Sequence, residues 1–327
     1  MILRISLYFV LTWNREEYNT AIVFRHICPY ERIYMKLLFI LLILIWIGFS
    51  HGGTFGQKLI SMSRAEIMKN MDEHFKKPCI FVPYTERGIL LDGKVSDPAW
   101  TEAEPVSFSF LNGTDGVPTQ KTEVRLISDS RFLYVGFICS EIDMQGISAF
   151  AGERDGALWK DDSVEIFLDV ENSGKWPRYF HFGTNTAGTV LDSKWRKTGW
   201  NSNVIVRTHT GNECWSAEFA IPFSDMVKDL KNISCVWGAN FTRCRQGRLR
   251  SKEKKNIPHF TEDTAWRPTG SWDAHEPEDF GCLFLEVAQK TAKGEISPEP
   301  FKPEKNHPDP MKACATPLKL TEKIEKR

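Results

Sequence analysis

The chain lacks an excess of charge of either sign. Its 327 residues include 42 Lys and Arg and 42 Asp and Glu, so the formal net charge is +0. A protein that binds nucleic acid needs a basic field over part of its surface, and this balance provides no such field. With 42% hydrophobic and 26% charged residues, the composition is that of an ordinary globular protein.

The chain also lacks the cysteine spacing of a zinc site. No Cys-x-x-Cys pair occurs among the cysteines that follow residue 50, and such close pairs mark most structural zinc sites. In an exported chain an odd number of cysteines leaves at least one thiol unpaired or paired with another chain. We interpret most of them as buried structural residues. They are Cys79, Cys139, Cys214, Cys235, Cys244, Cys282 and Cys314.

No apolar run is long enough to cross a bilayer comfortably, since a spanning helix needs about 20 residues. The run from Leu37 to Phe49 follows Met35 and a single lysine and ends in small residues, which is the pattern of a secretory signal. We therefore expect a signal peptide at 35–50, a mis-called upstream extension at 1–34, and a secreted or periplasmic protein without a membrane span after cleavage. An N-terminal membrane anchor is the alternative.

Long amphipathic helical patterns are missing after the signal. Residues 83–287 consist of short segments in which apolar and polar residues alternate, bounded by Gly, Asn, Asp or Pro. This period of two predicts an all-β fold, an antiparallel β-sandwich of the immunoglobulin-like or jelly-roll-like kind. Residues 51–82 are expected to be a linker that contains at most a short helix, at 63–75. The Pro-, Lys- and Glu-rich segment 288–327 is predicted to be a disordered tail.

One predicted strand carries residues that a core strand does not need. In "LWKDDSVEIFLDV" (158–170) the alternation sends Val, Ile and Leu to one face and Glu165 to the other. In "RYFHFGTN" (178–185) it sends His181 away from its two phenylalanine neighbours. If the two strands are antiparallel neighbours, Glu165 and His181 share one polar surface, with Trp159 at its edge.

Five segments of the chain occur in an order and spacing that form a family signature. The most specific part is the pair of patterns W-x-x-D-S-V-E-I-F, from residue 159, and S-W-x-x-x-x-x-x-x-F-G, from residue 271. The segments are "ILLDGKVSDPAW", "VRLISDSRFLYVGFIC", "LWKDDSVEIFLDV", "WSAEFAIPF" and "SWDAHEPEDFGCLFLEV". They resemble carbohydrate-binding module family 9, a DOMON-related β-sandwich, over about residues 83–287. The resemblance implies sugar binding, frequent attachment to glycoside hydrolases, and structural calcium.

The resemblance also implies a binding site. It places a sugar between two tryptophans, Trp159 and Trp272, with Glu165 on the strand after the first. The family's sugar-binding arginine falls at or near His181, and an asparagine falls near Thr269. The chemistry agrees, because aromatic rings stack on the apolar C–H faces of a pyranose while carboxylates and imidazoles bond its hydroxyls. We predict Trp159, Trp272, Glu165 and His181 as carbohydrate-binding residues and no catalytic residue.

These patterns predict a secreted, non-catalytic protein of carbohydrate catabolism that holds a poly- or oligosaccharide, with a glycoside hydrolase as an expected partner. The alternative is a glycoside hydrolase. Hydrolysis needs two carboxylates about 5–10 Å apart, but Asp162 and Glu165 point to opposite faces of a regular strand. We interpret Asp161 and Asp162 as a solvated strand start.

A haem-binding DOMON-type domain is the third hypothesis. His181 and His209 are candidate axial ligands, although the sequence contains no attachment motif. Calcium is expected from the resemblance only. The acidic segments "ERDG", "DVENSG" and "HEPED" could offer oxygen ligands of the kind that calcium prefers.

Overall fold

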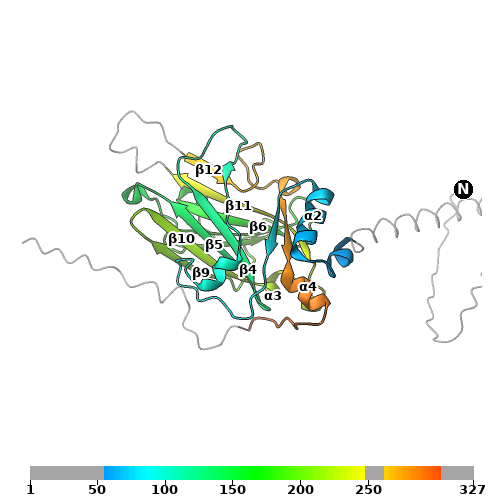
Figure 1. Cartoon of the computed structure of the whole chain (residues 1–327). Coiled ribbons are helices and arrows are strands. Elements are labelled where there is room, and N and C mark those ends of the chain that lie inside the picture. The colour runs from blue at the N-terminus through cyan, green and yellow to red at the C-terminus, as the bar shows by residue number, and fades with distance from the viewer. Residues whose placement is uncertain (1–54, 247–260, 303–327) are drawn as a thin grey trace, which may run out of the picture. The chain divides into compact units, whose positions relative to one another are not determined.

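Two β-sheets make up most of the computed structural model, which describes residues 55–246 and 261–302 (Figure 1). The predicted signal peptide (35–50) and upstream extension (1–34) are outside this range. None of the helices in the described residues is long and apolar enough to cross a membrane.

The larger sheet has eight strands in the order β1-β13-β11-β6-β7-β8, with β12 beside β11 and β3 beside β12. Its strands are β1 (Cys79–Val82), β3 (Ser109–Phe110), β6 (Ser163–Asp169), β7 (Phe180–Asn185), β8 (Val190–Lys194), β11 (Val236–Gln246), β12 (Thr261–Ala265) and β13 (Gly281–Leu285).

The smaller sheet has five strands in the order β2-β4-β5-β10-β9. Its strands are β2 (Val106–Ser107), β4 (Thr122–Ser128), β5 (Phe132–Ser140), β9 (Ile205–Thr210) and β10 (Cys214–Pro222). The prediction of a mostly β fold is therefore confirmed in its coarse form, as two sheets with few helices.

The helices are short and lie between or beside the strands. Among the helices that lie wholly within the described residues, the longest is α2 (Arg64–Phe75), which lies where a short helix is predicted and begins with a capping box in which Ser63 and Glu66 bond each other's backbone N–H. The others are α3 (Phe223–Met226) and α4 (Glu286–Ala292), and the 3₁₀ turns of these residues are η1 (Pro98–Glu102), η2 (Met144–Gly146), η3 (Leu158–Lys160), η4 (Leu230–Asn232) and η5 (Pro277–Asp279).

The main core lies between the two sheets. Val164, Ile166 and Leu168 of β6 are fully buried in it, as the alternation in the sequence predicts. Phe137 of β5 meets Phe241 of β11 with ring centroids 6.3 Å apart, so the inner faces of the two sheets are in contact. Removal of this apolar surface from water stabilises the pairing of the sheets.

The sheet begins earlier than the sequence predicts. β1 lies inside the segment 51–82 that we expected to be a linker, and it pairs with β13 in parallel. Four residues are too few to show a clear alternation, which is why the pattern missed it. The parallel pairing also departs from an entirely antiparallel fold. It is allowed because β1 and β13 are far apart in the chain, so no tight hairpin dictates their direction.

The predicted tail is wrong in its first part. Residues 286–292 form α4, in which Val287 is fully buried. The Gln289 side-chain amide donates to three backbone carbonyls just before α2, and Phe301 packs against Phe132 with centroids 4.9 Å apart. The Lys- and Glu-rich composition of this segment indicates disorder, and it does not reveal the few residues that make these contacts. The remainder of the predicted tail, 303–327, is not among the described residues.

The outer face of the smaller sheet is covered by the segment that precedes β2. Glu218 of β10 is fully buried there. Its carboxylate accepts hydrogen bonds from the backbone N–H groups of Asp92 (2.9 Å), Gly93 (2.7 Å) and Val95 (3.1 Å) and from the indole of Trp100 (3.0 Å). The carboxylate therefore fixes a loop that has no regular structure of its own.

Candidate functional site

A cleft of about 540 Å³ lies on the outer face of the larger sheet. β6, β7, β8, β11 and β12 contribute to its lining, together with the segments around η3 and residues 272–275. All four residues predicted from the sequence line this one cleft: Trp159, Glu165, His181 and Trp272. Polar residues that the sequence did not single out join them: Ser193, Arg196, Thr242, Cys244, Asp263 and His275.

Glu165 owes its place in the cleft to the pleat of β6. Its neighbours in the strand face the core, so its own side chain faces outward. Across the ladder it pairs with Gly183 of β7 on one side and Thr242 of β11 on the other. A β-carbon on residue 183 would lie 3.3 Å from Cγ of Glu165, so glycine at this position leaves the carboxylate room to lie over the strand.

Glu165 and His181 form a hydrogen-bonded pair. β6 and β7 are antiparallel neighbours, as the prediction required, and His181 Nε2 lies 2.9 Å from Glu165 Oε2. The imidazole stacks on Phe167, with centroids 4.4 Å apart and planes 9° apart, which fixes its orientation.

The electrostatics of this pair keep the carboxylate charged. Burial raises the pKa of Glu165, but the hydrogen bond and charge of His181 outweigh it, so the pKa lies below its ordinary value. Within the described part of the chain, Oε1 of Glu165 makes no hydrogen bond. Glu165 therefore presents an ionised acceptor to the cleft.

Trp159 stands at the rim on η3 and is 61% exposed. Leu158 beside it is fully buried and anchors the turn. The Trp159 carbonyl accepts a hydrogen bond from the Gln246 side chain at 2.9 Å, so the turn is tied to the end of β11. The regular strand begins only at Ser163, so Trp159 lies on a turn before the strand rather than on the strand itself.

The two aspartates after this tryptophan are buried, which corrects the expectation of a solvated strand start. Asp161 accepts hydrogen bonds from the backbone N–H groups of Phe150 and Ala151, both at 2.9 Å, and Asp162 accepts one at 2.7 Å from the same loop. Charge-assisted bonds to backbone N–H groups compensate for the burial of a carboxylate. These aspartates fix the loop behind Trp159, and neither lines the cleft.

Trp272 stands on another rim segment and is 70% exposed. The turn around it is closed by side-chain hydroxyls. Thr269 donates to the Asp273 carbonyl at 2.9 Å, Ser271 donates to the same carbonyl at 3.2 Å, and the Asp273 carboxylate accepts the backbone N–H of His275 at 2.9 Å. Thr269, which the resemblance placed near an asparagine, therefore supports the turn that carries Trp272.

His275 is a cleft residue that the sequence did not reveal. Its Nδ1 lies 2.7 Å from Tyr179 Oη. Burial, followed by the charges of His181 and Arg196, lowers the pKa of His275 to about 4, so the ring is neutral at neutral pH and offers one donor and one acceptor. Its segment, "HEPED", drew notice only for its carboxylates, and loop residues show no period that would assign them to a face.

A second carboxylate enters the cleft from β12. Asp263 pairs with Cys244 across the β11–β12 ladder. Burial raises the pKa of Asp263, a hydrogen bond from Cys244 opposes this, and the charges of Glu165 and Glu262 raise it further. The alternation along β11 and β12 was the signal that could have revealed these residues.

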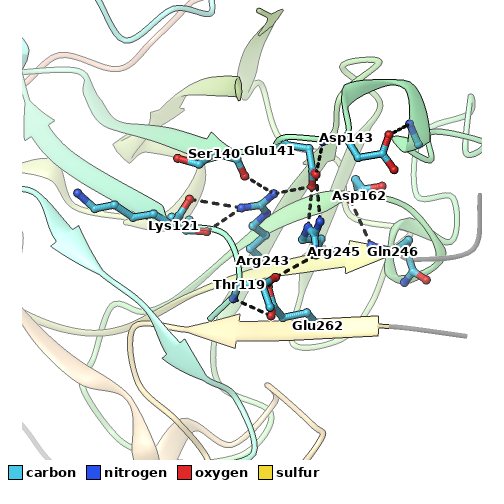
Figure 2. A network of polar contacts seen from close by, with 12 residues as sticks. Thr119, Lys121, Ser140, Glu141, Asp143, Asp162, Arg243, Arg245, Gln246 and Glu262 are labelled. Carbon is cyan, nitrogen blue, oxygen red and sulfur yellow. Dashed lines mark hydrogen bonds and ion pairs between the residues drawn. The ribbon is translucent and has the colours of Figure 1, made fainter. Parts of the chain in front are cut away.

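Figure 2 shows a polar network on the opposite side of β11, facing the smaller sheet. Arg245 donates two hydrogen bonds to the buried carboxylate of Glu141, at 2.6 and 3.0 Å. Arg243 donates to the Ser140 carbonyl at 3.0 Å and to the Thr122 hydroxyl at 3.2 Å. Buried charges with several hydrogen-bonded partners fix geometry. The network ties β11 to β4 and β5, so the residues that alternate with these arginines face the cleft.

The described residues do not define a calcium site. Among residues 55–246 and 261–302, no group of three or more His, Cys, Asp or Glu side chains is placed to hold a metal ion. In "DVENSG", the carboxylate of Asp169 accepts hydrogen bonds from the Glu171 and Gly174 N–H groups and from the Ser173 hydroxyl, so it closes its own loop. Calcium therefore stays a prediction without an assigned ligand set.

The two candidate haem ligands do not share a site. His181 lies on β7 of the larger sheet, where it bonds Glu165, whereas His209 lies on β9 of the smaller sheet. A pair of axial ligands would have to meet on opposite sides of one iron. This arrangement gives the haem hypothesis no support.

Fold and site together define a two-sheet protein with a polar cleft flanked by exposed tryptophans. Residues 91–286 match the family described as carbohydrate family 9 binding domain-like. The chain belongs to this family. A search of curated proteins gives no match.

Two solved structures similar to this chain are of a carbohydrate binding module family 9 protein from Caldicellulosiruptor kristjanssonii. The complex with cellotriose is 18% identical, with 64% of this chain and 93% of the other covered and a TM-score of 0.48. The complex with glucose is 17% identical, with 70% of this chain and 100% of the other covered and a TM-score of 0.46.

Proposed function

We propose that this protein binds a poly- or oligosaccharide in the cleft of the larger sheet, with the sugar held between Trp159 and Trp272. The observation that carries the proposal is the presence, in one cleft, of two exposed tryptophans and the hydrogen-bonded pair of Glu165 and His181. Indole rings bury the apolar faces of a pyranose. The carboxylate and the imidazole bond the hydroxyls at its edge.

The charge of the cleft favours a neutral sugar. Glu165, Asp263 and Asp273 line it with carboxylates, whereas Arg196 supplies a guanidinium and His181 is engaged by Glu165. A uronic acid would bring a further carboxylate among these groups, and repulsion between like charges in a partly buried site opposes that. We expect neutral oligosaccharides to bind more tightly than acidic ones in a glycan-array screen.

Calorimetry with a neutral ligand from that screen tests the role of the tryptophans. Trp159→Ala and Trp272→Ala should each weaken binding by about 2–4 kcal/mol, or roughly 30-fold or more, because each removes one stacking surface. Trp176→Ala is the matched control, since this ring is 62% exposed but does not line the cleft. Unchanged affinity in both cleft variants, or collapse of their thermal melts, would contradict the proposal.

Glycoside hydrolysis is the second candidate, and one observation favours it. Glu165 and Asp263 share the cleft, and their pKa values are shifted in opposite directions, as those of a general base and a general acid are. We nevertheless propose a non-catalytic binder, because Glu165 is already engaged by His181. Release of reducing sugar by the wild type, lost in Glu165→Gln, would make hydrolysis the function.

We further propose that the protein is exported and acts in carbohydrate catabolism beside a glycoside hydrolase. The support for export is the apolar run from Leu37 to Phe49, and the support for the catabolic role is membership of the carbohydrate-binding family. Expression from Met35 followed by N-terminal sequencing should find a mature chain that begins near His51 outside the cytoplasm. An intact segment on a cytoplasmic product would contradict export.

A further inference from the structure

A tight turn at the end of β8 lies beside the cleft. Lys194 and Lys197 bond each other through their backbone groups, with the Lys197 N–H at 3.0 Å from the Lys194 carbonyl and the reverse bond at 3.3 Å. Only Trp195 and Arg196 lie between them, and their φ angles are 54° and 61°. Positive φ at both central residues defines a type I′ hairpin turn.

The residues in this turn are poorly suited to it. Type I′ turns favour Asn-Gly, because a left-handed backbone brings the β-carbon of most residues close to the carbonyl that follows. Trp195 and Arg196 both carry long side chains at such positions. Backbone strain of this kind persists where surrounding structure enforces it, and it concentrates at functional sites.

The Arg196 side chain lines the cleft, together with His181, Ser193 and His275. The turn is held in place because the Trp195 backbone N–H donates to the Tyr179 carbonyl at 3.0 Å. Burial raises the pKa of Tyr179 to about 12, and the nearby charge of Arg196 opposes that rise. The Tyr179 phenol lies 2.7 Å from His275, which lines the same cleft as Arg196.

The chemistry of the cleft is therefore divided between donors and acceptors. Arg196 offers five N–H donors in a planar fork and no acceptor, whereas Glu165 and Asp263 supply carboxylates from β6 and β12. Adjacent hydroxyls of a pyranose present two oxygens that such a fork can bond in parallel. We propose that Arg196 determines specificity by donating paired hydrogen bonds to two neighbouring oxygens of a neutral sugar. This inference rests on the proposed function, and the strained turn is retained because it presents Arg196.

Replacement of the turn with its preferred residues provides the decisive test. The double variant Trp195→Asn/Arg196→Gly should melt at a higher temperature than the wild type, because the strain is relieved. It should also bind the neutral oligosaccharide about tenfold or more weakly, since charge-assisted bonds are lost. Trp195→Asn alone should keep most of the affinity. Arg178→Ala is the matched control, since Arg178 is an exposed arginine paired with Glu171 and does not line the cleft.

Two further measurements separate a binding role from a structural one. Arg196→Lys keeps the charge but not the fork, so it should lose nearly as much affinity as Arg196→Ala. In a series of monodeoxy sugars, removal of the bonded hydroxyl should weaken binding to the wild type and leave binding to Arg196→Ala almost unchanged.

Wild-type affinity in the double variant, or in Arg196→Lys, overturns the inference and leaves the proposed function intact. A double variant that melts lower than the wild type shows that the side chains support the fold, and this also overturns the inference. If the wild type binds no sugar while its fold is intact, the proposed function fails and this inference fails with it.

Discussion

Each sheet carries a glutamate on its outer face, fully buried in the smaller sheet and partly exposed in the larger one, and the two have opposite surroundings. Glu218 on β10 is sealed beneath a loop, and its carboxylate accepts four hydrogen bonds from backbone N–H groups and from Trp100. Glu165 on β6 bonds His181 and faces a cleft between two exposed tryptophans. Strand position alone does not distinguish them, because both are polar residues in alternating strands.

The difference shows how the surroundings of a carboxylate decide its use. Burial raises the pKa of Glu218, and the bonds from Gly93 and Trp100 only partly offset it, so this group serves to hold a loop. The pKa of Glu165 is lowered despite burial, because His181 stabilises its charged form. A charged carboxylate with bonding capacity left over can bind a ligand, whereas one whose capacity is used by the backbone stabilises the fold.

Among the variants predicted here to differ from the wild type, Glu218→Ala should have the largest effect, and this effect is on stability. Glu218→Ala leaves four donors, two buried and two partly buried, without an acceptor, and we expect a loss of about 3–5 kcal/mol in the free energy of unfolding. Urea unfolding measures it, and sugar affinity of the folded fraction should not change. Glu171→Ala is the control, because Glu171 is exposed at the surface. A loss below about 1 kcal/mol would show that the loop is held by other contacts.

Substitution of Glu165, the glutamate that faces the cleft, should change the affinity for sugar. Glu165→Gln keeps an acceptor but loses the charge-assisted bond, so sugar binding should weaken by about 1–3 kcal/mol. Stability should change far less than in Glu218→Ala, because Glu165 accepts no backbone hydrogen bond that the loop needs. Calorimetry and urea unfolding on the same sample give both quantities. Stability losses equal to those of Glu218→Ala would abolish the distinction between the two glutamates.

The cleft should also impose a pH dependence on stability through His275. Its pKa is about 4 in the fold against an ordinary 6.5, so the unfolded chain binds more protons between these values. Stability is therefore fully present above pH 6.5 and falls as the pH drops toward 4, by about 1–2 kcal/mol for a partly exposed ring. His275→Gln should flatten this slope when unfolding is followed between pH 5 and 7. An unchanged slope would assign the dependence to other groups.

The smallest effect is expected for Gly183→Ala, which reduces the space beside Glu165 without removing a polar group. In Gly183→Ala the new β-carbon lies 3.2 Å from the Leu158 side chain, 3.3 Å from that of Glu165 and 3.3 Å from the Val164 carbonyl. The two side chains can shift by a few tenths of an ångström but the carbonyl is fixed in its strand, so we expect losses of about 1 kcal/mol in stability and less in affinity. Gly199→Ala, with no heavy atom within 4 Å of its β-carbon, is the control. Equal behaviour of the two variants would show that Glu165 does not depend on the space above Gly183.

The sequence allowed a partial prediction of the site. Alternation along β6 and β7 assigned Glu165 and His181 to outward faces, and the family resemblance added Trp159 and Trp272. The alternation of apolar and polar residues predicts which face of a strand a side chain is on, but it does not predict which distant strands become neighbours. Asp263 on β12 and His275 in a loop reached the same cleft through pairings and turns that no local pattern encodes.

The fold was predictable to a similar depth, for the same reason. Strands with clear alternation were recognised, while β1 and α4 were missed because each is short and depends on a few distant contacts. Asp161 and Asp162 show the complementary error. Two adjacent aspartates suggest solvent exposure, yet backbone N–H groups from another loop make their burial favourable.

The parallel pairing of β1 with β13 has a consequence for how the chain reaches this fold. The first strand of the larger sheet finds its partner only in the last, so the contact spans almost the whole fold. Contacts between residues so distant in sequence slow folding, because a large loop must close before the contact contributes. During synthesis β1 has no partner strand until residues Cys282 to Leu285 of β13 have left the ribosome. Truncation before that strand would leave the apolar edge of β1 exposed and prone to pair with another chain.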